Sequence, residues 1–128
     1  MLDLKELISK VLTALLLKSI TLTHTSNNYV NATNFANIKA YRLGNLAMFI
    51  ADVRPSTSLP SNSTWVNIGT LPYNTVNEVG VTIPSQANVN ARVLFDITTS
   101  GIIRIYNGSG TATGTNYFRG ICFAVLDI

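Results

Sequence analysis

The strand that ends this chain is apolar on both of its faces, and this feature restricts the folds that the chain can adopt. Within residues 117–127, alternate positions hold Ile121, Phe123 and Val125, and the positions between them are apolar as well. Because successive side chains of a strand point to opposite faces, neither face of this strand suits water. A free edge of this kind would promote aggregation. We therefore expect one face to pack inside a β-sandwich and the other against a neighbouring subunit.

Turn-forming residues divide the chain from residue 38 onward into short segments of strand character. Gly44-Asn45, Pro72-Tyr73-Asn74 and Ser100-Gly101 are typical turn sequences. Short strands at this spacing predict a mainly β fold, an antiparallel β-sandwich of the jelly-roll type. The predicted strands are 38–43, 46–53, 64–70, 78–83, 91–98, 101–106 and 117–127.

Alternation within these strands predicts a core. Val93, Phe95 and Ile97 share one face of their strand. Ile103 and Ile105 share one face of the strand that follows. The segment 46–53 is apolar on both faces, as the last strand is, so we expect it to contribute to a subunit interface as well.

Residues 2–18 form the one extended helix that the sequence predicts. Apolar residues recur there with three-four spacing, which is typical of a coiled-coil seam. A second apolar stripe beside the seam suits either a trimer or packing of the helix onto the domain that follows. Burial of so short a seam gains less free energy than ordering the helix costs, so the main interface must lie elsewhere. The predicted interface residues are Leu4, Ile8, Val11, Leu15, Phe49, Ile121, Phe123 and Val125.

These elements divide the chain into three parts. Residues 1–18 are predicted to be an oligomerisation or docking helix. Residues 19–37 are polar and are predicted to be a linker with one or two short strands. Residues 38–128 are predicted to form the sandwich as a single head domain.

Composition argues against several classes of partner. Charged residues make up 12% and hydrophobic residues 47% of the chain, and the net charge is only +3. The arginines are spread along the strands and form no basic stripe, so we expect no nucleic-acid binding. The N-terminal segment carries early acidic residues and lacks the pattern of a signal peptide, and no segment is apolar over the length of a membrane span.

The residues that usually carry catalysis are few and scattered. A single cysteine, Cys122, and a single histidine, His24, predict neither a disulfide framework nor a metal site. No two of the six acidic residues share a motif, and the loop 107–116 has glycines but lacks the lysine of a phosphate-binding loop. We expect no enzyme and no cofactor, unless a site forms between subunits.

Aromatic and amide side chains near loops are the candidates for binding. Trp65 starts a predicted strand, where it can serve as a core or interface anchor or as a platform for sugar stacking. A tyrosine that flanks a loop is more often a packing residue at a sheet edge than a binding residue. The candidate contact residues are Trp65, Tyr73, Asn74, Tyr106, Asn107 and Tyr117.

The segments 65–72, 91–106 and 117–127, preceded by a short amphipathic helix, resemble the small trimeric β-sandwich domains of tailed bacteriophages and prophages. Such domains occur in tail-fibre, receptor-binding and head-fibre proteins and are similar in outline to tumour-necrosis-factor-like trimers. The resemblance covers roughly residues 63–128 and includes no catalytic signature. It departs from the family in lacking a long fibre shaft.

The resemblance implies a homotrimer in a virion that is assembled in the cytoplasm of a bacterial host. It further implies a fibre head or receptor-binding protein for host-surface glycans, with the helix contacting other virion proteins. Two alternatives stay open. One is a structural capsid or tail decoration protein without a receptor, and the other is a bacterial carbohydrate-binding module.

Overall fold

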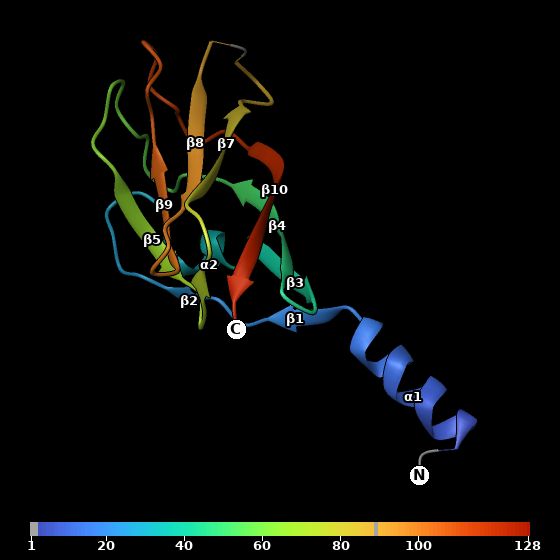
Figure 1. Ribbon diagram of the computed structural model, residues 1–128. Coiled ribbons are helices and arrows are strands. Elements are labelled where there is room, and N and C mark those ends of the chain that lie inside the picture. Colours follow the sequence, from blue (N-terminus) through green and yellow to red (C-terminus); the bar gives the residue numbers. More distant parts are fainter. Residues whose placement is uncertain (1–2, 89) are drawn as a thin grey trace.

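Two five-stranded antiparallel sheets face each other in the computed structural model of the protein (Figure 1). The structure describes residues 3–88 and 90–128, and the side chains of residues 13–15 lie outside the described set. The arrangement confirms a mainly β sandwich with antiparallel strands.

The first sheet contains the last strand of the chain, and we call it the β10 sheet. Its order is β1-β3-β4-β10-β6. The long strands β4 and β10 lie side by side in its middle and are antiparallel. The strands are β1 (Lys18–Ile20), β3 (Lys39–Leu43), β4 (Leu46–Val53), β10 (Phe118–Asp127) and β6 (Asn74–Thr75).

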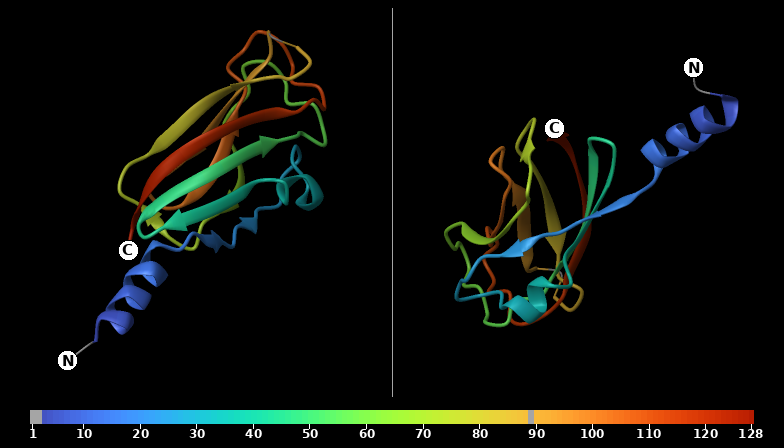
Figure 2. Two further views of the ribbon diagram at one scale, coloured as in Figure 1. Left: turned by 90° about the vertical axis from the view of Figure 1, so that its right-hand side faces the viewer. Right: turned by 90° about the horizontal axis from the view of Figure 1, so that it is seen from below.

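The second sheet, which we call the β9 sheet, covers the inner face of the first (Figures 1 and 2). Its order is β2-β5-β9-β8-β7. Gly101 supplies the positive φ of 78° that the tight turn between β8 and β9 requires. The strands are β2 (Thr23–His24), β5 (Val66–Thr70), β9 (Ile102–Tyr106), β8 (Arg92–Ile97) and β7 (Val79–Pro84).

Each of the seven predicted strands is present, and its ends differ from the prediction by two residues or fewer. The predicted helix 2–18 corresponds to α1 (Leu4–Leu15). Among the described residues, the strand β6 and the short helix α2 (Ala32–Phe35) add to these predicted elements, whereas β1 and β2 fall in or next to the segment 19–37, for which the sequence predicts one or two short strands. The two residues of β6 carry too little alternation to be recognised in a sequence.

The segment 19–37 crosses from one sheet to the other at one side of the sandwich (Figure 2). Its first residues are the last residues of β1 in the β10 sheet, and later residues of the segment form β2 in the β9 sheet. The His24 ring lies 5.3 Å from the Phe35 ring, and its Nε2 is 2.7 Å from the carbonyl oxygen of Val30. Gly69 leaves the space that the Phe35 ring fills. His24 therefore helps to hold this crossing in place.

The core lies between the sheets and contains all five residues that alternation predicts on β8 and β9, each fully buried. Phe49 is also fully buried, at 0% exposure, and its ring lies 6.5 Å from that of Phe95. The prediction of Phe49 as an interface residue is therefore wrong. Phe49 pairs with Cys122 on the inner face, whereas its neighbour Met48 pairs with Phe123 on the outer face.

Truncation of Phe49 tests this correction. We expect Phe49→Ala to lower the free energy of unfolding by about 3–5 kcal/mol, because it opens a cavity in the core. Urea unfolding followed by circular dichroism measures the loss. The variant should keep the oligomeric mass of the unaltered protein. A changed mass with unchanged stability would instead support a place for Phe49 in a subunit interface.

Candidate functional site

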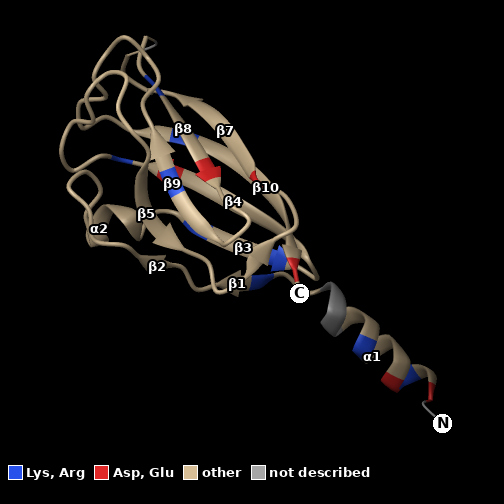
Figure 3. Cartoon of the chain, turned by 60° about the vertical axis from the view of Figure 1, so that its left-hand side comes forward, with Lys and Arg blue, Asp and Glu red and all other residues tan. Residues whose placement is uncertain are grey.

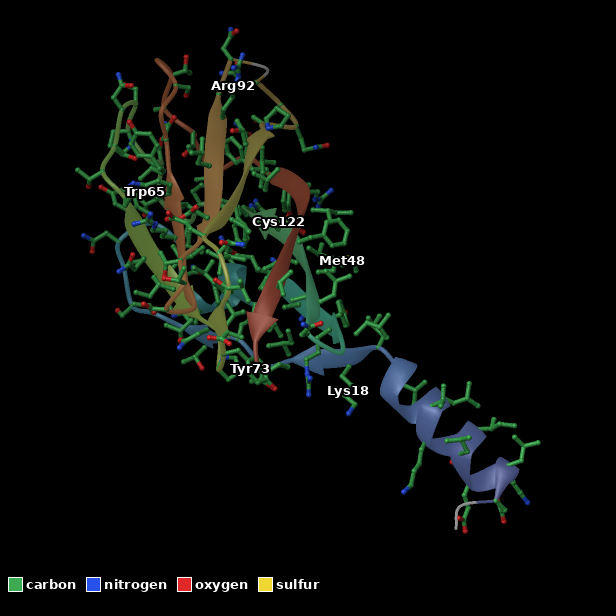
Figure 4. The ribbon with its side chains drawn as sticks, viewed as in Figure 1. Lys18, Met48, Trp65, Tyr73, Arg92 and Cys122 are labelled. Atoms are coloured by element: carbon green, nitrogen blue, oxygen red, sulfur yellow. The ribbon has the colours of Figure 1, made fainter. Side chains whose placement is uncertain are left out.

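The outer face of the β10 sheet is apolar and uncovered. Ile121 and Phe123 expose 55% and 56% of their surface, although they lie in the middle of the sheet. Strand register places them in rows with residues of β3 and β4, so the exposed side chains are contiguous. Met48 projects from this face in Figure 4. We call this surface the apolar face; it consists of Leu43, Leu46, Met48, Ile50, Ile121, Phe123 and Val125.

The helix α1 exposes a second apolar surface. Leu4, Ile8 and Val11, three of the four predicted seam residues, are exposed, and Leu15 has its side chain outside the described residues. The helix leaves the sandwich next to β1, an edge strand of the β10 sheet. It slants toward the side that the apolar face occupies (Figures 1 and 2). The two apolar surfaces therefore lie on one side of the molecule.

The outer face of the β9 sheet is of a different kind, because it carries aromatic and charged side chains. Trp65 is 40% exposed, and its ring lies 5.3 Å from that of Tyr106. The Arg104 guanidinium carbon lies 4.1 Å from the centre of the Trp65 ring, within the range of a cation–π contact. We call this face the polar face. Figure 3 shows basic and acidic positions side by side on β9 and β8.

Arg104 joins the aromatic pair to two carboxylates. Its Nε donates a hydrogen bond of 2.7 Å to Oδ2 of Asp96, and its Nη2 forms an ion pair with Glu78. Asp96 is 8% exposed, and burial raises its pKa above the ordinary value of 3.8 despite the opposing effect of Arg104. The same hydrogen bond raises the pKa of Arg104 above its ordinary value. The guanidinium is thus held firmly beside Trp65.

Two hollows adjoin this group of residues. The first, about 550 Å³, is lined by polar residues of the segment 25–29 together with Trp65 and Asn67. The second, about 450 Å³, lies toward the far end of β7 and β8, where Arg92 is labelled in Figure 4. Aromatic rings beside amide-lined hollows are surfaces on which sugars can stack and form hydrogen bonds.

The structure separates the six predicted contact residues into different places. Trp65 and Tyr106 lie together on the polar face. Tyr73 and Asn74 lie near the end from which the helix leaves, where the Arg42 guanidinium covers the Tyr73 ring. Tyr117 is held between the guanidinium groups of two arginines, Arg54 and Arg119.

Asn107 is not a contact residue, and its prediction is wrong. It is fully buried, and its Nδ2 donates hydrogen bonds to three carbonyl oxygens, those of Leu59, Pro60 and Thr111. Its Oδ1 accepts hydrogen bonds from the backbone and hydroxyl of Ser109. The side chain therefore organises the loops at the far end of the sandwich, and a ligand cannot reach it.

Sequence reasoning missed the charged members of the polar face. Alternation on the strand 101–106 places Arg104 on the same face as Tyr106, and this signal could have identified it. Asp96 gave no signal of its own, because it lies between the apolar residues Phe95 and Ile97. Only the pairing of β8 with β9, which sets Asp96 opposite Arg104, reveals its role.

Comparison with protein-family models, with curated proteins and with solved structures finds no match. Within the described residues, no group of three or more histidine, cysteine or acidic side chains is arranged to hold a metal ion. No helix in the same part of the chain is both long enough and apolar enough to cross a membrane.

The buried amide of Asn107 leads to a stability prediction. Asn107→Ala removes the hydrogen bonds that the buried amide makes to three carbonyl oxygens and to Ser109, so we expect the free energy of unfolding to fall by at least about 2 kcal/mol. Urea unfolding measures the effect. The control Asn74→Ala removes the same group from an exposed position of β6 and should change stability by less than about 0.5 kcal/mol. Equal effects of the two substitutions would contradict the structural role of Asn107.

The raised pKa of Asp96 leads to a pH dependence. Between the ordinary value of 3.8 and the raised value, the folded protein keeps a proton that the unfolded chain releases, so stability falls as the pH rises through this interval. Asp96→Asn removes this contribution. As the pH rises from about 3 to 7, we expect the free energy of unfolding of Asp96→Asn to increase relative to that of the unaltered protein. A movement in the opposite direction would mean that Arg104 outweighs burial.

Proposed function

We propose that this chain is a virion structural protein of a tailed bacteriophage or prophage, assembled as a homotrimer, that forms a fibre head or receptor-binding head for host-surface glycans. The observation that carries the proposal is the apolar face. Contiguous exposed apolar surface of this kind marks an interaction site in most proteins. The resemblance of residues 63–128 to phage sandwich domains supplies the biological setting, including assembly in the cytoplasm of a bacterial host.

The occupant of the apolar face in this proposal is another copy of the same chain. The face and the exposed stripe of α1 lie on one side of the molecule, so one symmetry axis can bury both. Besides Leu4, Ile8 and Val11, the stripe includes Leu7 and Leu12, and it is wider than a two-stranded coiled coil needs. This width favours three chains, with a jelly-roll-like sandwich above each helix. The free end of the helix bundle then contacts other virion proteins.

The polar face supports the recognition half of the proposal. It lies on the sheet opposite to the apolar face and so stays exposed when sister chains cover the latter. Trp65 with its flanking hollows provides a shallow surface of the kind that sugars bind. Three such surfaces on one trimer would raise the affinity for a repeated cell-surface glycan through multivalency.

Two other functions would use parts of the same structure. A decoration protein needs the apolar face but no ligand on the polar face. A carbohydrate-binding module needs the polar face but acts as a monomer more often. Oligomeric mass separates the module from the other two functions, and glycan binding separates a receptor-binding head from a decoration protein.

An arginine placed on the apolar face tests assembly. We expect the unaltered protein to sediment with three times the mass of one chain. Phe123→Arg places a charge where sister chains would exclude water, and should reduce the mass to that of a single chain with unchanged circular dichroism. Analytical ultracentrifugation at micromolar concentration measures both masses.

The control for this experiment is Asn67→Arg, an exposed strand position on the opposite sheet, which should keep the trimer. A monomeric unaltered protein that stays folded would refute the assembly proposal. A trimer that tolerates Phe123→Arg would place the interface on another surface.

A further inference from the structure

The hollow at the end of the sandwich far from α1 has the chemistry of an anion site. It has a volume of about 450 Å³ and lies between the ends of β7 and β8 and the loop that follows β9. No acidic residue is among those that line it within the described chain. The lining residues are Thr82, Asn90, Arg92, Leu94, Gly108, Ser109 and Gly110.

Arg92 is the charged group of this hollow, and it has no partner among the residues that the structure describes. Within residues 3–88 and 90–128, the other arginines all make a hydrogen bond, an ion pair or a contact with an aromatic ring; these are Arg42, Arg54, Arg104 and Arg119. The Arg92 side chain is exposed and makes none of these interactions with any described residue. A guanidinium without a carboxylate beside it retains its full capacity for bidentate binding of an anion.

The loop after β9 lines the same hollow with residues that carry unused backbone donors. The backbone N–H groups of Gly108 and Gly110 donate no hydrogen bond to any described residue, while the hydroxyl of Ser109 is engaged with Asn107 and Thr111. The buried Asn107 amide holds this loop in place through Ser109 and Thr111. The free donors are thus attached to a fixed part of the structure.

Leu94 is the one apolar side chain among the described residues that line the hollow, and it lies next to the aromatic pair. Leu94 is paired with Tyr106 across the β8–β9 ladder. Gly108 lies against the Tyr106 ring, since a Cβ at this position would be 2.8 Å from Cε1 of the ring. An apolar side chain beside hydroxyl and amide groups, here Leu94 beside Thr82 and Asn90, fits the mixed polar and apolar faces of a sugar ring.

We propose that this hollow binds a sugar residue that carries a carboxylate, with Arg92 forming a bidentate pair with the acid group and the ring packing on Leu94. This inference rests on the proposed receptor function and names the chemical class of the glycan. The residues that line this hollow are not among the six contact residues predicted from the sequence, although one of those six, Tyr106, lies beside it.

Calorimetric titration of the full-length protein tests the site with four probes: trigalacturonic acid, N-acetylneuraminic acid, neutral galactotriose and glycerol phosphate. We expect at least one of the two carboxylated sugars to bind at least about tenfold more tightly than galactotriose and glycerol phosphate. The preference should weaken as salt is added, because the charges lie near the surface. Arg92→Ala should abolish it, and Arg92→Lys should restore it only in part, because lysine lacks the planar fork.

The matched control is Arg42→Ala, which removes the same charge near Tyr73, far from the hollow, and should leave binding unchanged (Figure 4). Equal binding of acidic and neutral sugars, unaffected by Arg92→Ala, would overturn the acid-sugar inference while leaving glycan recognition standing. Tighter binding of glycerol phosphate would overturn the carboxylate assignment. A trimer that binds no probe would overturn the inference and would favour the decoration protein.

Discussion

The antiparallel pairing of β4 with β10 is the interaction on which the rest of the structure depends. Eight residue pairs connect the two strands, from Phe118 with Val53 to Val125 with Leu46. This register turns Phe49 and Cys122 inward and Met48 and Phe123 outward. Because side chains alternate with a period of two, a slip of one residue would exchange the core with the surface. Most side chains of both sets are apolar, but the outer set includes Asp52 and Arg119, so such a slip would turn these two charges toward the core.

The consequence of this pairing is a molecule with two chemically different outer faces. The β10 sheet carries its apolar face in the middle, and its ion pair between Arg119 and Asp52 lies beyond the apolar rows, toward the far end of the strands. The β9 sheet instead has its buried and half-buried charges at the centre, where Arg104 joins Asp96 to Trp65. An interface between copies of the chain favours a surface without charges that would lose their water, and recognition of a polar ligand favours the opposite. The fold separates these two requirements by assigning one sheet to each.

Asparagine side chains fix the loops that complete the polar face. Asn107 holds the loop after β9 against the segment 59–60, and Asn27 accepts hydrogen bonds from the backbone of Tyr29 and Val30 in the loop beside Trp65. Amides can satisfy several backbone groups at once without the desolvation cost of a charge. The abundance of asparagine in a chain with few charges is therefore partly a matter of loop architecture. This also explains why an asparagine beside an aromatic residue was a poor guide to ligand contact.

The sequence by itself determined the long strands, the helix α1 and the core of β8 and β9, because alternation and helical periodicity are local patterns that burial enforces. It also determined that Ile121, Phe123 and Val125 share a face of the last strand. Only the tertiary structure decided that Phe49 lies inside, that Asn107 is buried and that Asp96 meets Arg104. Each of these depends on which strand or loop lies opposite, and such neighbours are far apart along the chain. Local patterns describe what each segment prefers, whereas contacts between distant segments decide which side chains remain available for a partner.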